Sequence, residues 1–311
     1  MPDRRRFKFI INPEAGRGKS RNLFSVLHSM LLSRGVEFSI DTTKMASEAI
    51  DLARESSKDF DVVVAVGGDG TANEVANGVF GSNASMGVIP SGSGNDFGKL
   101  LGMSDDIAIS VERLLDGPTR KIDCGTVSLE SDGAPKHVRK FVNSIGIGFD
   151  AIVAYESQRI KHLNGLPLYL LSVGRSFKKL RPHPFKVAID GKTEEENYAL
   201  VCVGNGNREG GGFYVTPNAD PCDGEFEVCT VKAVSILRAL RILPTLLTGK
   251  HGQFQEVEFH ATRHVSVVSG DPFVVHCDGE ILGTQGRNID IELITASLNV
   301  IVAPSGFDLT S

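Results

Sequence analysis

Three glycine-rich segments near the start of the chain carry the residue types that phosphate chemistry needs. Residues 12–19 (NPEAGRGK) place glycines and a lysine where backbone N–H groups can approach an anion. Residues 67–71 (GGDGT) add Asp69, a carboxylate suited to Mg²⁺, and residues 90–97 (PSGSGNDF) add a second carboxylate in Asp96. These residue types indicate a site for a phosphate group and a divalent cation.

Each segment also has a plain structural interpretation, because glycine-rich turns commonly join a strand to a helix. Asn95 or Asp96 would then only cap a helix, and residues 12–19 lack the glycine spacing of a Walker A loop. All three segments, however, follow apolar stretches that read as strands. Ligands of open α/β sheets bind beyond the carboxyl ends of the strands, so the joint pattern favours a binding site.

The elements around these loops predict an α/β domain with a parallel sheet. Residues 61–66 (DVVVAV) are almost entirely apolar, which is typical of a strand buried on both faces. After the first loop, helical spacing places five apolar residues on one face, Leu23, Val26, Leu27, Met30 and Leu31, and Ser47 stands where a later helix would begin. The predicted strands are 8–11, 36–40, 61–66 and 86–89, and the predicted helices include 47–55 and 72–79.

The pattern changes near residue 122 to short alternating strands, which predict an antiparallel β-sandwich. Asp190-Gly191 and Asp278-Gly279 each stand between alternating runs, which is a strong signal for a type I′ hairpin turn. Helical stretches interrupt this half at about 150–180 and 234–247. The predicted strands are 138–145, 185–190, 198–204, 225–231, 263–268, 273–277, 288–294 and 297–302.

The composition of the chain excludes several classes of protein. The 311 residues carry a formal net charge of −5 and are 41% hydrophobic, which excludes a disordered chain and argues against a nucleic-acid partner. The cysteine count of 5 is odd and no pair forms C-x-x-C, so we expect free thiols. No apolar run is long enough for a membrane span, and FKFII is too short for a signal peptide. We therefore expect a cytoplasmic protein.

The three motifs, in this order and spacing, resemble those of the bacterial diacylglycerol kinase and lipid kinase family, which is related to sphingosine and NAD kinases. The resemblance covers nearly the whole chain. It implies a nucleotide-binding α/β domain over residues 1–122, similar to phosphofructokinase and NAD kinase, with a parallel sheet. It also implies an antiparallel β-sandwich domain for the lipid over 123–296, and a final strand at about 297–311 that returns to the first domain.

The resemblance implies which residues bind ATP and Mg²⁺. Asp69 and Asp96 match two members of an acidic network around a catalytic Mg²⁺, and Asp123 matches a third. Phosphoryl transfer depends on positioning and on a cation that neutralises developing charge, so the network is chemically sensible. The positions matched to ATP contacts are Asn12, Pro13, Glu14, Ala15, Gly16, Thr43, Gly68, Asp69, Gly70, Thr71, Glu74 and Ser93.

Two further assignments in the second half rest on the resemblance. It makes Glu280, after Asp278-Gly279, the general base for the lipid hydroxyl, whereas the residues alone give only a hairpin turn followed by a carboxylate. It also implies a structural Mg²⁺ held by the Asp223 side chain and the carbonyl groups of Asp220 and Glu225. The alternative for this second cluster is a surface turn with acidic side chains.

The leading hypothesis is an ATP- and Mg²⁺-dependent lipid kinase, with diacylglycerol as the expected acceptor and phosphatidic acid as the product. An NAD kinase-like enzyme and a non-catalytic nucleotide-binding regulator remain alternatives. The acceptor would place the protein peripherally at the inner membrane face. Residues 163–180 combine an apolar stretch with a basic end, so they are a membrane-facing segment or a helix that covers the sandwich. Residues 234–247, with two arginines among leucines, are a cover helix or a lid. A homodimer is left open.

Overall fold

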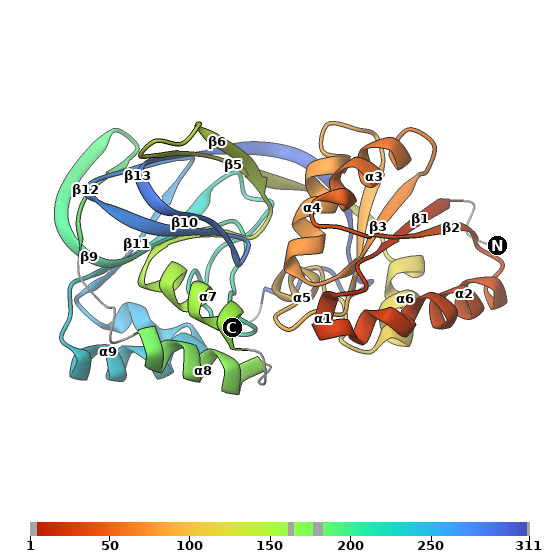
Figure 1. Cartoon of the computed structure of the whole chain (residues 1–311), viewed down its shortest axis with the longest axis horizontal. Helices are drawn as coiled ribbons and strands as arrows, with labels where there is room; N and C mark the ends of the chain where they lie inside the picture. The colour runs from red at the N-terminus through yellow and green to blue at the C-terminus, as the bar shows by residue number, and fades with distance from the viewer. Residues whose placement is uncertain (1–4, 161–164, 177–182, 310–311) are drawn as a thin grey trace. The chain divides into compact units, whose positions relative to one another are not determined.

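The computed structural model describes residues 5–160, 165–176 and 183–309 of the chain. They form two compact units, and Figure 1 shows the elements of each. The first unit comprises Met1–Ile122 and Ala296–Asp308, and the second comprises Asp123–Thr295 and Leu309–Ser311. The chain enters the second unit within strand β5 (Thr119–Ser131) and leaves it within strand β13 (Glu280–Ile301).

The first unit is built on parallel strand pairs. Strand β1 (Arg6–Ile11) pairs in parallel with β2 (Glu37–Thr42) and with β3 (Val62–Gly67). Strand β3 also pairs in parallel with β4 (Ser85–Pro90), and the end of β13 joins β4 through Val300 and Met86. Every residue of β3 is buried, as its apolar run predicts. The carboxyl ends of β1, β3 and β4 therefore lie at one edge of the sheet.

Helices cover both faces of this sheet. Figure 1 shows α3 and α4 on one side of the strands, and α2 and α6 on the other. Leu23, Leu27 and Leu31 of α2 are buried as predicted, whereas Val26 is 45% exposed, so the prediction that it belongs to the buried face is wrong. Ser47 precedes α3, but its side chain caps nothing, so the predicted N-cap interaction is wrong. The helices are α1 (Ala15–Gly18), η1 (Lys19–Asn22), α2 (Leu23–Ser33), α3 (Glu48–Ser56), α4 (Asp69–Val79), α5 (Asp96–Leu100) and α6 (Ile107–Asp116).

The second unit is sandwich-like, and its strand pairs are antiparallel. Strands β9 and β12 each pair with β7 over one stretch and with β8 over another, so the strands enclose a core. That core is made largely of Val, Ile and Phe side chains. The remaining strands are β6 (His137–Phe141), β7 (Ser144–Gly148), β8 (His183–Ile189), β9 (Lys192–Gly204), β10 (Phe226–Lys232), β11 (Val257–Thr262) and β12 (His264–Cys277).

Several predicted boundaries in this unit need correction. The single strand expected at 138–145 is two strands, whereas 263–268 and 273–277 belong to the one strand β12. Strand β13 likewise joins 288–294 to 297–302, and β11 was not predicted. The helical stretches resolve into α7 (Phe149–Arg159), α8 (Gly165–Ser176), α9 (Ile236–Ile242), η3 (Leu243–Thr248) and η4 (Lys250–Gln253). The basic end of the 163–180 segment lies outside the described residues.

Two sequence expectations concern the chain as a whole. The five cysteines are all free thiols, as expected, and only Cys222 is exposed. Among the helices of the described ranges, none is long and apolar enough to cross a membrane.

Candidate functional site

The three glycine-rich loops of the first unit pack backbone against backbone at the strand ends. A Cβ atom on Gly92 would lie 2.4 Å from the Cα atom of Gly68, far inside van der Waals contact. Gly16 has a φ of +58°, and a Cβ atom there would lie 2.2 Å from the carbonyl oxygen of Ser91. Only glycine permits these approaches, so the glycines position the loops against one another.

Side-chain hydrogen bonds join the same loops. The Asn12 side-chain amide donates to the Thr71 hydroxyl at 3.0 Å. The hydroxyl groups of Ser20 and Ser91 lie 2.8 Å apart. The Asp69 carboxylate accepts from the backbone N–H of Phe97 at 3.1 Å, in the first turn of α5. Residues predicted for one function in three separate motifs therefore lie in one connected group.

The helix that follows β3 can receive an anion. Helix α4 begins at Asp69, and its N-cap Gly68 supplies no side chain to satisfy the first backbone N–H groups. Such N–H groups and the helix dipole favour a phosphate at this end. Gly70 follows in the first turn without a side chain, whereas Ser93 stands exposed in the neighbouring loop. The arrangement can hold phosphate oxygens on backbone donors.

The other residues matched to ATP contacts have mostly structural partners. The backbone N–H of Thr43 donates to Ile11 at 2.9 Å, which extends the pairing of β2 with β1. Glu74 accepts from the backbone N–H of Ser47 at 3.0 Å, before the start of α3. Glu14 makes an exposed ion pair of 2.6 Å with Arg21, and Pro13 and Ala15 flank it in the first loop.

The predicted magnesium residues divide between the two units. Asp69 is half-buried and Asp96 is buried in the first unit, beside the loops described above. Asp123 belongs to the second unit, where it is buried and accepts from the backbone N–H of Gly224 at 2.8 Å. The backbone N–H of Asp123 donates in turn to the Pro221 carbonyl at 2.7 Å. Asp123 therefore lies against the turn predicted to hold the structural ion.

The acidic turn has the donor chemistry of a cation site. Burial raises the pKa of Asp223, and the negative charges of Asp220, Glu225 and Asp123 raise it further, against a lowering hydrogen bond from Glu225. Asp223 and Glu225 also line a cavity of about 140 Å³. Clustered carboxylates and carbonyl groups around such a space suit a hard divalent cation such as Mg²⁺.

The turn before Glu280 is held by a buried carboxylate. Asp278 and Gly279 have φ values of +48° and +79°, which confirms the predicted type I′ turn. The Asp278 side chain accepts three backbone N–H groups, at distances between 2.8 and 3.0 Å, from Val142, Asn143 and Ser144. These bonds also explain why the predicted strand 138–145 is interrupted, because the backbone there binds a side chain instead of a strand.

Glu280 itself keeps part of its carboxylate in solvent. Its side chain is 39% exposed and forms an ion pair of 2.7 Å with Arg139 of β6. Asp190-Gly191 has nearly the same backbone, with φ values of +47° and +78°, but Lys192 follows it and Asp190 is exposed. The two hairpins thus share a turn type, and only the second presents an acid after it.

Sequence reasoning missed a buried charged group in the second unit. His276 Nε2 lies 2.6 Å from Asp150 Oδ2 and 3.6 Å from Glu209 Oε2, and all three residues are buried. A Cβ atom on Gly146 would lie 2.1 Å from Asp150 Oδ2, so this glycine makes room for the group. The backbone nitrogen of Gly279 lies 3.3 Å from His276 Nδ1, which places the group beside the turn before Glu280.

The pKa values of the two carboxyl groups in this cluster shift in opposite directions. Burial and the Asp150 charge raise the pKa of Glu209, which favours a protonated acid. Burial alone would also raise the pKa of Asp150, but the His276 ring outweighs it and lowers that pKa. A polar residue inside the apolar run FVVHC was the only signal of this group in the sequence.

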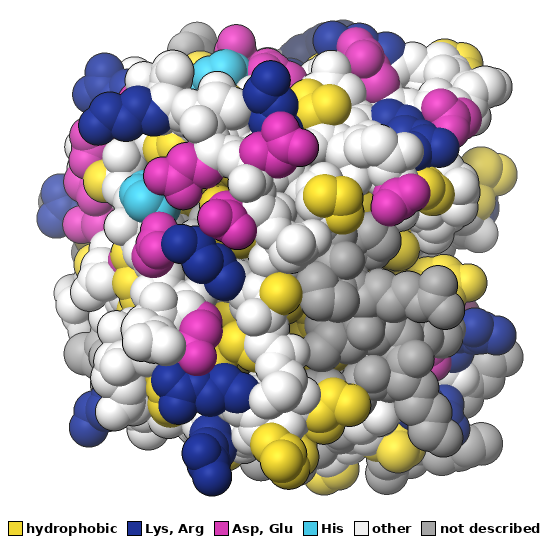
Figure 2. All heavy atoms as spheres, turned by 90° about the vertical axis from the view of Figure 1, so that its left-hand side faces the viewer, with side chains coloured by type: hydrophobic (Ala, Val, Ile, Leu, Met, Phe, Trp, Pro, Cys, Tyr) yellow, Lys and Arg dark blue, Asp and Glu magenta, His cyan; other side chains and the backbone are white. Residues whose placement is uncertain are grey.

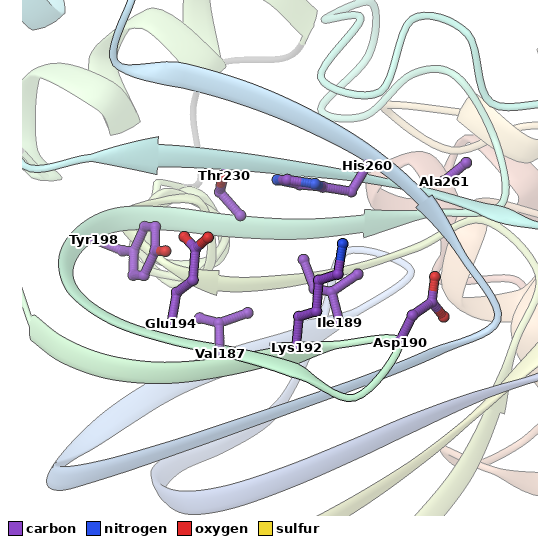
Figure 3. Close-up of a pocket in the computed structure, with 9 residues that line it drawn as sticks. All are labelled: Val187, Ile189, Asp190, Lys192, Glu194, Tyr198, Thr230, His260 and Ala261. Carbon is purple, nitrogen blue, oxygen red and sulfur yellow. The ribbon is translucent and has the colours of Figure 1, made fainter.

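A separate cavity of about 220 Å³ lies on the sandwich. Figure 3 shows Lys192, Glu194 and Tyr198 of β9 lying below His260 of β11. None of the predicted site residues lines this cavity. It is smaller than the roughly 300 Å³ at which small-molecule pockets begin, so it does not suit a diacyl lipid.

Comparisons with known proteins identify the family. Residues 6–127 match the family model of the diacylglycerol kinase catalytic domain. Residues 143–302 match the YegS C-terminal NAD kinase beta sandwich-like domain. The chain belongs to the diacylglycerol kinase family. It is therefore an enzyme of the lipid kinase class.

Known diacylglycerol kinases align with nearly the whole of this chain. A diacylglycerol kinase of Mycobacterium tuberculosis is 30% identical, over 94% of this chain and 93% of the relative. One from Bacillus subtilis is 28% identical, over 90% of this chain and 91% of the relative. The match thus covers at least 91% of each of these relatives.

Solved structures share the fold. A crystal structure of a diacylglycerol kinase from Bacillus anthracis has a TM-score of 0.72 at 23% identity, covering 97% of this chain and 98% of that one. A further structure from the same organism has a TM-score of 0.75 at 25% identity, with the same coverage. The yeast NADH kinase, at 9% identity and a TM-score of 0.51, covers 96% of this chain and 83% of its own, and shows likeness of fold alone.

Proposed function

We propose that this enzyme transfers the γ-phosphoryl group of ATP to the free hydroxyl of diacylglycerol, giving ADP and phosphatidic acid. The observation that carries the proposal is the contact between the Gly68 and Gly92 loops at the strand ends. Backbone packing of this kind, next to the uncapped start of α4, is what a site for phosphate oxygens requires. Membership of the diacylglycerol kinase family supports the choice of acceptor.

The first unit supplies nucleotide binding in this proposal. The loop from Asn12 to Gly16, the start of α4 and Ser93 hold the phosphate chain. Thr43 and Glu74 border the same loops. Asp69, Asp96 and Asp123 would hold the catalytic Mg²⁺, and Asp220, Asp223 and Glu225 would hold the structural one. When bound, the catalytic ion neutralises charge on the phosphate oxygens.

The second unit supplies the base. Glu280 takes the proton of the lipid hydroxyl on a carboxylate oxygen, and the hydroxyl oxygen then attacks the γ-phosphorus as the bond to ADP breaks. The ion pair of 2.7 Å with Arg139 orients the carboxylate. Geometry of this kind matters because phosphoryl transfer is catalysed mainly by positioning.

The acceptor also determines where the enzyme works. Diacylglycerol lies in a bilayer and ATP lies in the cytoplasm, so the enzyme would act peripherally at the inner membrane face. No membrane-crossing helix is needed for this, and the described helices include none.

The test is transfer of labelled γ-phosphate from ATP, with Mg²⁺, to lipids in mixed detergent micelles. The panel contains diacylglycerol, monoacylglycerol, a sphingoid base and phosphatidylglycerol, together with NAD and a blank without lipid. We expect labelled phosphatidic acid. Glu280→Gln should lower the rate by at least about 100-fold, a typical value for loss of a general base.

A matched variant separates chemistry from surface charge. Glu195→Gln removes an exposed carboxylate of β9 in the same unit and should leave the rate unchanged. Labelled NADP as the only product would move the enzyme to the NAD kinase class. A full rate in Glu280→Gln would remove Glu280 from the mechanism. No labelled product from any acceptor, with ATP still bound, would favour the regulator hypothesis.

A further inference from the structure

Helix α9 turns apolar side chains toward solvent. Leu237 is 75% exposed, Ile236 is 54% exposed and Leu240 is 50% exposed. At the end of the same helix, Ile242 is buried and packs into a small second core of the sandwich unit. An amphipathic helix on a globular protein normally turns its polar face outward, so this helix has the opposite pattern on its outer face.

The helix is fixed in this orientation by one arginine. Arg238 donates two hydrogen bonds to the Glu256 carboxylate, at 2.8 and 2.9 Å. Its guanidinium also lies 4.8 Å from the centre of the Phe254 ring. The bidentate pair and the ring hold Arg238 against the body of the unit. The exposed leucines are therefore presented by an anchored element.

Charge around this helix is one-sided. Residues 233–255 contain no Asp or Glu, although the whole chain has 38 such residues. The same segment carries Arg241 and Lys250, which are exposed and, within the described part of the chain, form no ion pair. We define the α9 face as Ile236, Leu237, Leu240 and Arg241. It is an apolar surface bordered by unpaired positive charge on a protein of net charge −5.

The same contrast is visible on the surface. Figure 2 faces the sandwich unit from the left of Figure 1 and shows acidic and basic side chains intermixed across its upper and middle parts. Its lower edge, where α9 lies in Figure 1, carries hydrophobic and basic side chains.

We propose that the α9 face docks on an anionic lipid bilayer. This proposal rests on the proposed function, because a kinase of a bilayer lipid must reach its acceptor at a membrane surface. Leucines enter the boundary between headgroups and acyl chains, and flanking cations pair with anionic headgroups, as in interfacial helices. A protein partner would explain the leucines, but the exclusion of acidic residues from the whole segment favours an anionic surface.

The experiment measures partitioning of the full chain onto vesicles by flotation. One set of vesicles contains phosphatidylcholine with about a third phosphatidylglycerol, and the other contains phosphatidylcholine alone. We expect binding to the anionic set that is several-fold stronger, because each basic residue near such a surface contributes roughly fivefold. Leu237→Glu should weaken binding at least about tenfold, since it removes apolar burial and adds repulsion. Arg241→Ser should cost about fivefold, and only on the anionic vesicles.

A matched control uses Val138 of β6, which is 60% exposed in the same unit. Val138→Glu makes the same kind of change away from the α9 face and should leave partitioning unchanged. Absence of wild-type binding to anionic vesicles would overturn the proposal, and so would equal losses in Leu237→Glu and Val138→Glu. Sedimentation of the wild type as a dimer that Leu237→Glu dissociates, with vesicle binding intact, would assign the face to a second copy instead.

Activity measurements separate this proposal from the proposed function. Leu237→Glu should lower phosphorylation of diacylglycerol in vesicles while leaving the rate in detergent micelles unchanged, because docking is not needed there. No transfer by the wild type in micelles would refute the proposed function without touching vesicle binding. Transfer in micelles with equal vesicle activity in the variant would refute the docking surface alone.

Discussion

The buried carboxylate of Asp278 should contribute more to folding than any other side chain in the hairpin it begins. It accepts three backbone N–H groups from the Val142–Ser144 segment and is almost inaccessible to solvent. Asp278→Ala would leave these three donors without an acceptor. Each buried donor left unsatisfied costs about 1–3 kcal/mol, so the sum over three donors is roughly 3–9 kcal/mol. That is a large part of the roughly 5–15 kcal/mol that stabilises a typical domain.

Asp278→Asn is the more informative change because it keeps the left-handed turn conformation, which Asn tolerates well. One oxygen can still accept from Asn143 and Ser144, but an amide NH₂ group then faces the Val142 N–H. We expect a loss of about 2–3 kcal/mol. Asp190→Asn is the matched control, since its φ of +47° is nearly that of Asp278 and its side chain is exposed. It should cost less than about 1 kcal/mol.

The assay is urea unfolding of both Asn variants, followed by circular dichroism, with the slope compared to that of the wild type. A loss confined to Asp278→Asn would support the hydrogen-bond account. Equal losses of unfolding free energy in the two variants would refute it, because the loss would then come from the turn conformation and not from the hydrogen bonds. The kinase rate of Asp278→Asn should also fall when it is measured without urea, at a temperature at which the variant stays folded. The reason is that the turn that presents Glu280 loses the hydrogen bonds that hold it.

Three further predictions concern the loops and two buried titratable groups. Gly92→Ala should lower ATP affinity at least about tenfold in calorimetry, because its Cβ atom would lie 2.4 Å from Gly68 Cα, whereas Gly174→Ala, with no atom within 4 Å, should not change it. The raised pKa of Glu209 means that the folded state binds a proton that the unfolded state has released, so the contribution of Glu209 to stability falls as pH rises above about 4.3. Glu209→Gln does not titrate, and its unfolding free energy relative to wild type should rise as the pH increases above that value; a constant difference would contradict this. Burial lowers the pKa of His251, so below about pH 6.5 the unfolded state binds a proton that the folded state does not bind. The free energy of unfolding should therefore decrease as the pH is lowered below that value. His251→Gln should reduce the slope of this decrease.

Local patterns in the sequence predicted the first unit well. The apolar run at 61–66 is β3 within one residue, and the following GGDGT loop begins a helix as expected. Asn95 stands at the N-cap position of α5, as the structural alternative had it, but its side chain accepts from the backbone N–H of Gly92, and the Asp69 carboxylate binds the first turn of α5 instead. The Asp69 carboxylate, which the motif assigned to Mg²⁺, therefore also makes a structural hydrogen bond that no local sequence pattern predicts.

Groups assembled from distant segments were the ones that sequence reasoning could not find. Asp150, Glu209 and His276 come from a helix, a loop and a strand, and no common spacing relates them. Asp123 was assigned to a magnesium network by resemblance, but its contact with the N–H of Gly224, 101 residues away, could not be inferred from spacing. Strand β11 was also missed, since Glu258 and His260 interrupt its apolar pattern.

Gly146 restricts how this sandwich can change during evolution. Its missing side chain is the space that Asp150 and His276 occupy, so any larger residue there collides with both partners at once. Replacing His276 or Asp150 first leaves a buried charge without its partner. Replacing Gly146 first forces two charged groups apart. Each single step passes through a less stable protein, so the glycine and the charged pair should be inherited together, and replaced together, in related sequences. Tracing these positions across the family would show whether the buried pair was gained once and then retained.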